Sequence, residues 1–494
     1  MNPFLRQLHD LSYSQQGIGK SCGFLLLMGL ATAGITGSIL RLVEIPEPPP
    51  PDAIEQIYGQ YLLVTYQTEF EADLLPGFPT PDPRHQRLFS SPTEKWLPEL
   101  KEQAGSHDPE SGVRFALGLW EQDQGNLSEA IELFHQENLE YPHPLVRQME
   151  LDTILRSRDP DRLLELRKNP DYTHELHPGY FFRMGMLTQN WPMILRWFWP
   201  AEYYGIQPQV LLFSLLAGAI WGALILSLLP HRRSVKIFSL AVAALGLGWI
   251  STWPTIWSGI WLDTRFHLEE GIDFASSLLY FLVSVGLREE VCKLLLFIPF
   301  LFWVRKPGRD IEALIFGALV GLGFAVEENI NYFTNYQGSG VVVSRFVSAN
   351  LLHLTLTGVN ALALTRAVRD PGRWTSDFVQ TLAITIGLHG LYNTLLSQPI
   401  PGLGDMSYFS GTALAGCAFY FFRNVQELSP VRASRISRTA LFCWGFCTLF
   451  NLELLTASVW LPFSEALYLT GQSALSGVFI GYIFLHEIRE PLAA

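Results

Sequence analysis

The stretch IDFASSLLYFLVSVGLREEVCKLLLFIPFLFWV, residues 272–304, decides the fold of this chain. It is apolar over a length that would be about 50 Å as one straight helix. Two adjacent glutamates, Glu289 and Glu290, lie in its middle, and Lys293 follows one helical turn later. Charged side chains at bilayer depth cost of order a few kcal/mol each, so they usually mark a functional site. The stretch therefore predicts a membrane span that carries a chemically active centre.

The composition of the whole chain is that of a membrane protein. Its 494 residues are 49% hydrophobic and only 16% charged, whereas soluble proteins are roughly 25% charged. Apolar stretches of span length recur along the sequence, which predicts an all-α, polytopic membrane protein with about ten spans. The predicted spans are residues 21–40, 209–229, 236–257, 272–304, 312–333, 346–368, 378–397, 408–424, 439–460 and 467–485.

The negative charge is concentrated in one segment. The formal net charge is −12, and the segment from Arg41 to Gln207 holds 27 acidic and 14 basic residues, which accounts for the whole excess. This asymmetry predicts a separate soluble domain. We expect residues 1–20 to form a cytoplasmic N-terminus, 21–40 a transmembrane anchor or a cleavable signal peptide, 41–207 an extracytoplasmic helical domain, and 208–494 the polytopic membrane domain.

The soluble segment begins with a proline run, residues 46–51, that predicts a stiff spacer. Its clearest pattern runs from Phe115 to Phe134, with small and aromatic residues at the offsets of a tetratricopeptide-type helical hairpin. We therefore predict a tetratricopeptide-like domain, with an unspecific helical hairpin domain as the alternative.

The loops between the predicted spans alternate in charge, and every second connection is basic. Because basic loops stay in the cytoplasm, this alternation predicts a multi-pass protein of the cell (inner) membrane with residues 41–207 outside. The basic connections contain Arg232, Arg233 and Lys236, then Arg305, Lys306 and Arg309, then Arg366, Arg369 and Arg373, and then Arg423, Arg432, Arg435 and Arg438.

The same alternation requires residues 272–304 to cross the membrane once, although they are longer than one crossing needs. We expect a bend or break at Gly286, just before the glutamates, which would open them to a hydrated cavity. The alternative is a helix that projects beyond the bilayer.

The first glutamate pair has a basic partner on its own helix. Glu289 and Lys293 are i, i+4 neighbours, and Glu290 and Lys293 are i, i+3 neighbours, so the lysine can pair with one carboxylate while the other stays free. Adjacent carboxylates in a low dielectric split their proton affinities, as a catalytic pair requires. An ion pair that only holds helices together is the alternative.

Three later spans carry further polar groups. Glu327 and Glu328 form a second acidic pair, and His353, His389 and Asn393 lie on the spans that follow. An imidazole can accept a proton, orient a water or bind a metal, and an amide can donate to an oxyanion. A single membrane histidine is usually a packing residue, but two histidines with two acidic pairs predict a hydrolytic site.

Three of these segments resemble the motifs of a known family. Residues 289–293 fit the EExxK motif of the PrsW-type intramembrane proteases, Phe324 to Glu328 fits their FxxxE element, and His389 to Asn393 fits an HxxxN-like motif. The last motif is shared with the wider superfamily of CAAX prenyl proteases and bacteriocin-processing enzymes. In the prenyl proteases the second motif ends in histidine, so the resemblance leaves open whether Glu327, Glu328 or His353 fills that role here.

The resemblance implies an intramembrane endopeptidase that cleaves membrane-anchored proteins, such as anti-sigma factors, within or next to their transmembrane helix. We predict that Glu290 is the general base, that Glu289 shares its proton or pairs with Lys293, and that no cofactor is needed. The other predicted catalytic residues are Glu327, Glu328, His353, His389 and Asn393.

We expect His389 and Asn393 to polarise the scissile carbonyl and His353 to position the water. A zinc site is the alternative, and its ligands would be Glu290, His353 and His389. The family is often labelled as metalloprotease.

Two other functions remain open at this point. Intramembrane glutamates and histidines also occur in ion- or proton-coupled transporters, and the chain could instead be a non-catalytic scaffold or sensor. We expect the outer domain to bind protein rather than nucleic acid or anionic lipid, because it is acidic. The expected partners are thus a membrane-anchored protein substrate and the lipid bilayer.

Overall fold

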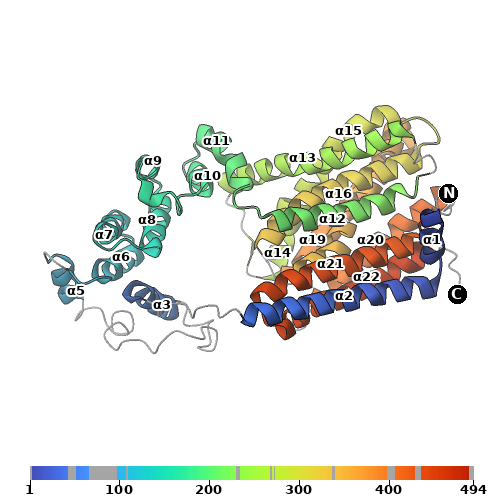
Figure 1. The fold of residues 1–494 in the computed structure, drawn as a ribbon. Coiled ribbons are helices and arrows are strands. Elements are labelled where there is room, and N and C mark those ends of the chain that lie inside the picture. Colours follow the sequence, from blue (N-terminus) through green and yellow to red (C-terminus); the bar gives the residue numbers. More distant parts are fainter. Residues whose placement is uncertain are drawn as a thin grey trace. The chain divides into compact units, whose positions relative to one another are not determined.

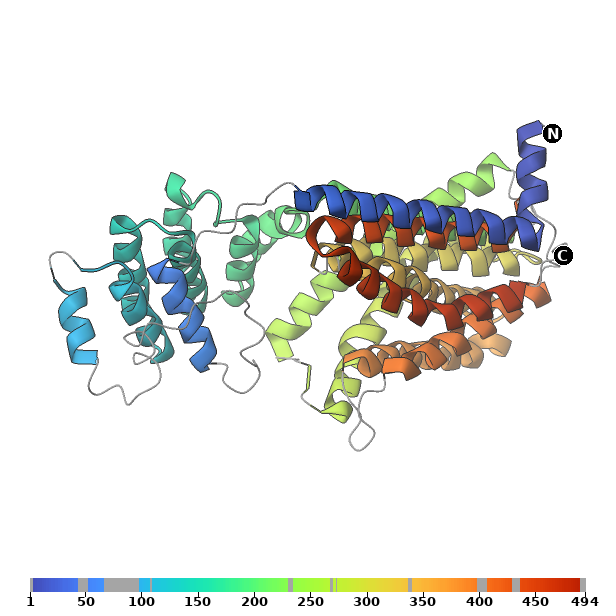
Figure 2. The ribbon, with the colours of Figure 1, turned by 60° about the horizontal axis from the view of Figure 1, so that its bottom comes forward.

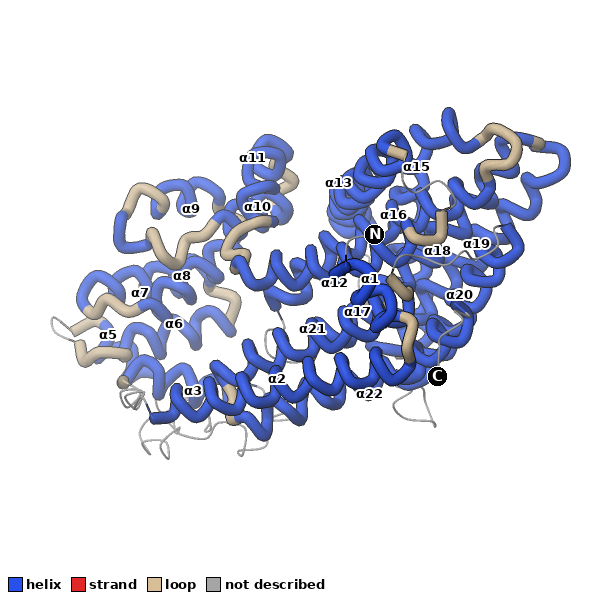
Figure 3. The backbone as a smooth tube through the Cα atoms, turned by 45° about the vertical axis from the view of Figure 1, so that its right-hand side comes forward, coloured by secondary structure: helices blue, strands red, loops and turns tan. Residues whose placement is uncertain are grey.

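The structure is a computed structural model that describes residues 3–42, 52–65, 97–106, 109–229, 234–266, 270–271, 273–335, 340–397, 407–428 and 436–488. Within these residues every regular element is a helix and no strand occurs (Figure 3). The all-α prediction is therefore confirmed for the described part of the chain.

The chain divides into two compact units. One unit comprises Met1–Ile45 and Ile206–Ala494, and the other comprises Pro46–Gly205. The predicted proline spacer at residues 46–51 lies outside the described residues, as do four of the basic loop residues: Arg232, Arg233, Arg432 and Arg435.

The unit Pro46–Gly205, called the outer unit below, is a series of short helices (Figure 1). Phe115 of α6 and Phe134 of α7 are fully buried, with ring centroids 5.7 Å apart. The predicted hairpin thus lies on two helices that pack together, and the assignment to the tetratricopeptide class stays a prediction. The helices are α3 (Ala53–Thr65), α5 (Leu97–Ala104), α6 (Val113–Asp123), α7 (Leu127–Glu140), α8 (Pro144–Ser157), α9 (Pro160–Leu166), the 3-10 turn η3 (Pro170–Tyr172), α10 (Pro178–Leu187) and α11 (Trp191–Glu202).

The other unit, called the membrane unit, is a bundle of long helices that lie side by side (Figures 1 and 2). Every predicted span falls on a helix of this bundle. The helices are α1 (Pro3–Ser12), α2 (Gln15–Leu42), α12 (Pro208–Leu226), α13 (Val235–Phe266), α14 (Phe274–Tyr280), η4 (Phe281–Leu287), α15 (Arg288–Val304), α16 (Asp310–Asn335), α17 (Val341–Val347), α18 (Ala349–Arg369), α19 (Pro371–Ser397), α20 (Ser407–Leu428), α21 (Arg438–Trp460) and α22 (Phe463–Ile488).

Among the residues that the structure describes, five helical segments are long and apolar enough to cross a membrane. They support a membrane-integral protein, whereas the count of ten spans stays a prediction. The five segments are Gln15–Ile39, Pro208–Leu226, Val235–Leu262, Val341–Arg369 and Arg438–Trp460.

The buried centre of the bundle is α16, which packs against α12, α13, α15 and α18. Glycine allows these close approaches. A Cβ atom on Gly321 would lie 2.2 Å from the carbonyl oxygen of His353 in α18, and one on Gly248 of α13 would lie 2.0 Å from the carbonyl oxygen of Val320. Because real Cβ contacts are never this short, the absence of a side chain lets α18 carry His353 close against α16.

The deciding stretch is one helical path with a change of pitch. Residues 281–287 form a π-helical segment, η4, between α14 and α15, and Ile272 lies outside the described residues. The helix does not end at Gly286, so the break that was one form of the prediction is absent; the helix widens there instead, and the bend stays a prediction. A Cβ on Gly286 would lie 3.0 Å from the carbonyl oxygen of Ile386, so α19 packs directly on the widened turn. Single π-helical turns of this kind are frequent at functional sites.

The first apolar stretch is a continuous helix, α2, that lies along α21 (Figure 2). Trp444 of α21 donates from its indole nitrogen to the hydroxyl of Ser21, and the Asn451 amide donates to the carbonyl of Leu25, both at 2.7 Å. These contacts favour a retained anchor over a cleaved signal peptide. That the anchor is retained stays a prediction.

Candidate active site

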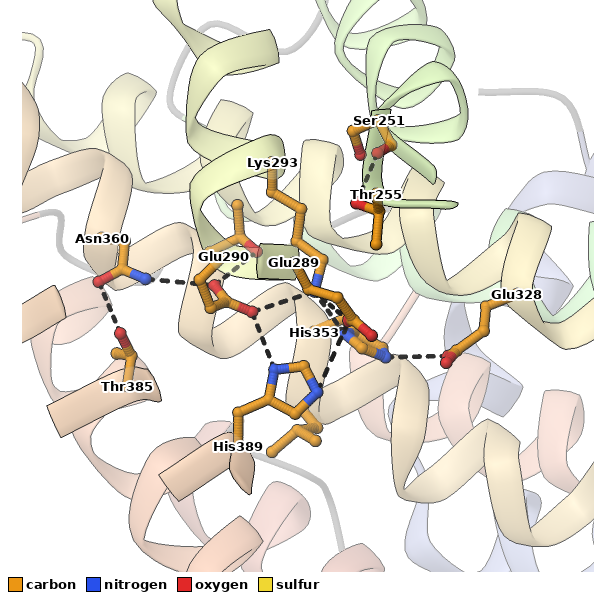
Figure 4. Close-up of polar contacts among 12 residues, drawn as sticks. Ser251, Thr255, Glu289, Glu290, Lys293, Glu328, His353, Asn360, Thr385 and His389 are labelled. Atoms are coloured by element: carbon orange, nitrogen blue, oxygen red, sulfur yellow. Dashed lines mark hydrogen bonds and ion pairs between the residues drawn. The ribbon is translucent and has the colours of Figure 1, made fainter. Parts of the chain in front are cut away.

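Five titratable side chains from three helices of the membrane unit meet in one buried cluster (Figure 4). Glu289, Glu290 and Lys293 come from α15, His353 from α18 and His389 from α19, and none of the five is more than 6% exposed. The sequence placed these five groups on three separate spans, and the structure brings them together.

The ammonium group of Lys293 lies in the middle of the cluster. It donates to Glu289 Oε2 at 3.1 Å, to Glu290 Oε1 at 3.0 Å, and it lies 2.8 Å from His353 Nδ1. It also lies 4.0 Å from the centre of the Phe324 ring on α16. Both carboxylates therefore share one cation, instead of one being paired and one left free.

His353 is oriented by the second acidic pair. Its Nε2 lies 3.0 Å from Glu328 Oε2, and Arg345 donates to the same oxygen at 2.5 Å. An ionised carboxylate beside an arginine accepts the Nε2 proton, which leaves the lone pair on Nδ1 facing the cluster. Glu328 thus fixes the tautomer of His353 from outside the cluster.

His389 is oriented in the same way, by Glu290. Its Nδ1 lies 3.2 Å from Glu290 Oε1, and its Nε2 lies 3.6 Å from Glu289 Oε2 (Figure 4). Donation from Nδ1 to Glu290 leaves the Nε2 lone pair facing Glu289. Each histidine therefore contacts a carboxylate through one nitrogen. The other nitrogen of His389 faces Glu289, whereas that of His353 contacts the Lys293 ammonium group and lies 3.9 Å from Glu289 Oε2.

Both carboxylate oxygens of Glu290 accept hydrogen bonds from neighbouring side chains. Besides Lys293 and His389 on Oε1, its Oε2 accepts from the Asn360 amide at 3.2 Å and from the Thr357 hydroxyl at 3.4 Å. The hydroxyl of Thr385 donates to Asn360 Oδ1 at 2.9 Å and holds that amide in place. A carboxylate with this many partners, at 0% exposure, is a fixed structural acceptor.

Asn360 and Thr385 are not among the residues predicted from the sequence. A signal was present, because Asn360 lies seven residues after His353 and three after Thr357, which is one face of a helix. Nothing in the sequence distinguishes it from an amide that only pairs neighbouring helices.

Glu289 is the less constrained member of the pair. Its Oε2 is bonded to Lys293, whereas its Oε1 makes no hydrogen bond to any residue that the structure describes. Its side chain is 7% exposed, compared with 0% for Glu290. The structure thus separates two glutamates that the sequence could not tell apart.

Glu289, His353 and His389 form a group whose donor atoms all lie within 4.8 Å of one another, as a metal ion would require. The sequence predicted Glu290 as the carboxylate of this set. In the structure the group contains Glu289 instead, while Glu290 accepts from Asn360 and Thr357, and a metal role for either glutamate stays a prediction. One carboxylate and two imidazoles are a usual ligand set of hydrolytic zinc, so the residues fit the ion.

The remaining predicted residues have peripheral positions. Glu328 contacts His353 from outside the cluster, while Glu327 is buried on the same helix at 2% exposure. Asn393 follows His389 by one turn, is partly exposed, and makes no side-chain hydrogen bond within the described residues.

The fold and the site define a helical membrane protein with a buried centre of carboxylates, imidazoles and an ammonium group, as expected of an intramembrane hydrolase. Residues 208–422 match the family described as PrsW family intramembrane metalloprotease, and this match confirms the resemblance for that part of the chain. All five cluster residues lie in the matched range, whereas the outer unit, α2, α21 and α22 lie outside it. Comparisons with curated proteins and with solved structures gave no match.

Proposed function

We propose that the chain is an intramembrane endopeptidase that hydrolyses a peptide bond in, or next to, the transmembrane helix of a membrane-anchored protein. The observation that carries this proposal is the buried cluster in which His353, His389 and Lys293 surround Glu289, while Glu328 and Glu290 orient the two histidines. The family match supports the reaction class.

The arrangement changes the assignment of the general base from Glu290 to Glu289. Glu290 has no unused oxygen, whereas Glu289 Oε1 is available to a water molecule. In the proposed reaction Glu289 takes a proton from water as the water oxygen attacks the scissile carbonyl carbon. The proton then passes to the leaving amine as the carbon–nitrogen bond breaks.

The negative charge that develops on the carbonyl oxygen needs a cation nearby. The Lys293 ammonium group lies 3.1 Å from Glu289 Oε2, so it can stabilise an oxyanion formed beside that carboxylate. We assign Glu290, Glu328, Asn360 and Thr385 the task of holding Lys293 and the histidines in position. Asn393, which the sequence had placed at the oxyanion, is not needed for this step.

The residues present also fit a divalent metal ion, zinc by preference, held by Glu289, His353 and His389. When bound, such an ion would polarise the carbonyl and acidify a water molecule. Lys293 contacts two of these three groups, so its ammonium group and the ion compete for them. Glu289 would serve either as ligand to an ion or as the free base, and metal analysis of the purified chain distinguishes the two. About one ion per chain, with a lower content in His389→Ala, would favour the metal-bound form, whereas an active chain without metal would favour the base mechanism.

The function is tested by replacing Glu289 with glutamine in the full-length chain. Single-span membrane proteins tagged at both ends are co-expressed as a panel of substrates. A protease loses cleavage with this substitution while the chain stays folded, a transporter loses proton or sodium flux in vesicles, and a scaffold loses neither. Cleavage that continues unchanged in the folded variant contradicts the proposal.

We further propose that the protein lies in the cell inner membrane with the outer unit on the extracytoplasmic side, as the loop charges indicate. In this arrangement the outer unit would recruit or restrict protein substrates such as anti-sigma factors. Reporter fusions at residues 105 and 230 would report opposite sides of the membrane, and the same side for both would refute this topology.

A further inference from the structure

Helix α11 is the last helix of the outer unit (Figure 1). It carries apolar side chains on both its buried and its exposed face. Its inner face packs within the unit, where Met193, Ile194 and Phe198 are buried. Its outer face carries large apolar side chains in helical register: Trp191 is 42% exposed, Leu195 is 62% exposed and Trp199 is 39% exposed. A surface helix normally has a polar outer face, so this stripe indicates a contact surface.

The charge of the stripe differs from that of the domain around it. The exposed positions of α11 are Trp191, Pro192, Leu195, Arg196, Trp199 and Pro200, with one arginine among them. Glu202, in the same register, is partly buried at the last position of the helix. The segment from Arg41 to Gln207 has almost twice as many acidic as basic residues. Tryptophan and leucine with one arginine, and a carboxylate only at the end of the helix, suit the interface between lipid headgroups and acyl chains.

The chain itself brings this helix to a membrane. α11 ends at Glu202, and α12, one of the helices apolar enough to cross a bilayer, begins at Pro208. Five residues connect them, and five residues reach at most about 17 Å when fully extended. A helix tied so closely to a membrane-spanning helix has the bilayer surface as its nearest large apolar partner.

We propose that the outer face of α11 is a membrane-interface helix that docks the outer unit on the phospholipid surface. The stripe Trp191–Leu195–Trp199 enters the region between headgroups and acyl chains, and Arg196 lies at the level of the phosphates. Because this contact involves only lipid, the proposal does not depend on the proposed peptidase activity.

The test places an environment-sensitive probe on the stripe of the full-length chain. All five natural cysteines are replaced by alanine, and Leu195→Cys is labelled with a nitrobenzoxadiazole fluorophore in phosphatidylcholine nanodiscs. The matched control is Leu139→Cys on α7, because Leu139 is 64% exposed and Leu195 is 62% exposed. Phosphatidylcholine that carries a spin label near the headgroup then quenches any probe that lies at the interface.

We expect the spin-labelled lipid to quench the probe at position 195 at least about two-fold more strongly than the probe at position 139. Equal quenching would overturn the proposal, and a blue-shifted but unquenched probe at 195 would overturn it in favour of a protein partner. Hydroxyl-radical footprinting of the unmodified chain provides a second measurement. In nanodiscs it should label Leu195 less than Leu139, and equal labelling would again overturn the proposal.

Discussion

Replacing each of the adjacent glutamates by glutamine should separate the reacting carboxylate from the orienting one. In Glu290→Gln the side-chain oxygen can still accept from Asn360 and Thr357, but the charge beside Lys293 and the acceptor for His389 are lost. Removing a residue that orients an active imidazole typically costs about 10–100-fold in activity. That corresponds to about 1.4–2.7 kcal/mol.

Glu289→Gln removes the proton acceptor itself. A positioned general base contributes typically about 10²–10⁴-fold, or about 2.7–5.4 kcal/mol. Lys293 keeps its 3.0 Å contact with Glu290 in this variant, so the buried ammonium group stays paired and the fold should persist. We therefore expect Glu289→Gln to be the slower variant by a factor of about ten or more.

The assay is the initial rate at which each purified variant cleaves one end-tagged single-span protein in proteoliposomes. Thermal unfolding in detergent accompanies the rates and shows that both variants are folded. If Glu290→Gln loses as much activity as Glu289→Gln, or more, the reasoning that assigns the base to Glu289 is refuted.

Three further predictions concern the second acidic pair, the packing of α16 and the buried glutamates of the outer unit. Glu328→Gln should lower the cleavage rate by about 10–100-fold with little change in unfolding temperature, because it releases the site histidine on α18; an unchanged rate would contradict this role. Gly321→Ala should destabilise the membrane unit by about 1–3 kcal/mol in thermal unfolding, whereas Gly246→Ala, where a Cβ meets nothing within 4 Å, should be neutral. In the outer unit, burial raises the pKa of Glu137 and Glu150. The protonated forms of these two glutamates therefore stabilise the folded unit. This stability is complete below the ordinary glutamate pKa and is lost as the pH rises through the folded-state pKa. Hydrogen exchange in α7 and α8, corrected for the intrinsic rate, should therefore be faster at about pH 7 than at about pH 4.

Hydropathy was sufficient to place the helices of the membrane unit. Every predicted span falls on a helix, because an apolar run of span length has few other stable structures in a bilayer. The π-helical turn at residues 281–287 could not be predicted in this way. It depends on the packing of α19 against Gly286, which is a tertiary contact between residues far apart in the sequence.

The sequence also identified the members of the cluster but not their separate roles. Glu289 and Glu290 are chemically identical neighbours whose side chains point about 100° apart on a helix. Which of them faces the free imidazole nitrogens depends on where α18 and α19 pack, and this placed Glu290 against Asn360 and left Glu289 between the two histidines. For the same reason the sequence could not tell which glutamate lies within reach of both imidazoles, which in the structure is Glu289.

The most direct test of the account is to map cleavage sites in proteoliposomes that contain the purified chain and one single-span membrane protein. Mass spectrometry of the products identifies the new chain ends, and His389→Ala is the matched variant. The account predicts new ends within or next to the transmembrane helix of the substrate, present with the natural chain and absent with His389→Ala. Fragments that persist when His389 is replaced would contradict the proposal that this buried cluster performs the hydrolysis.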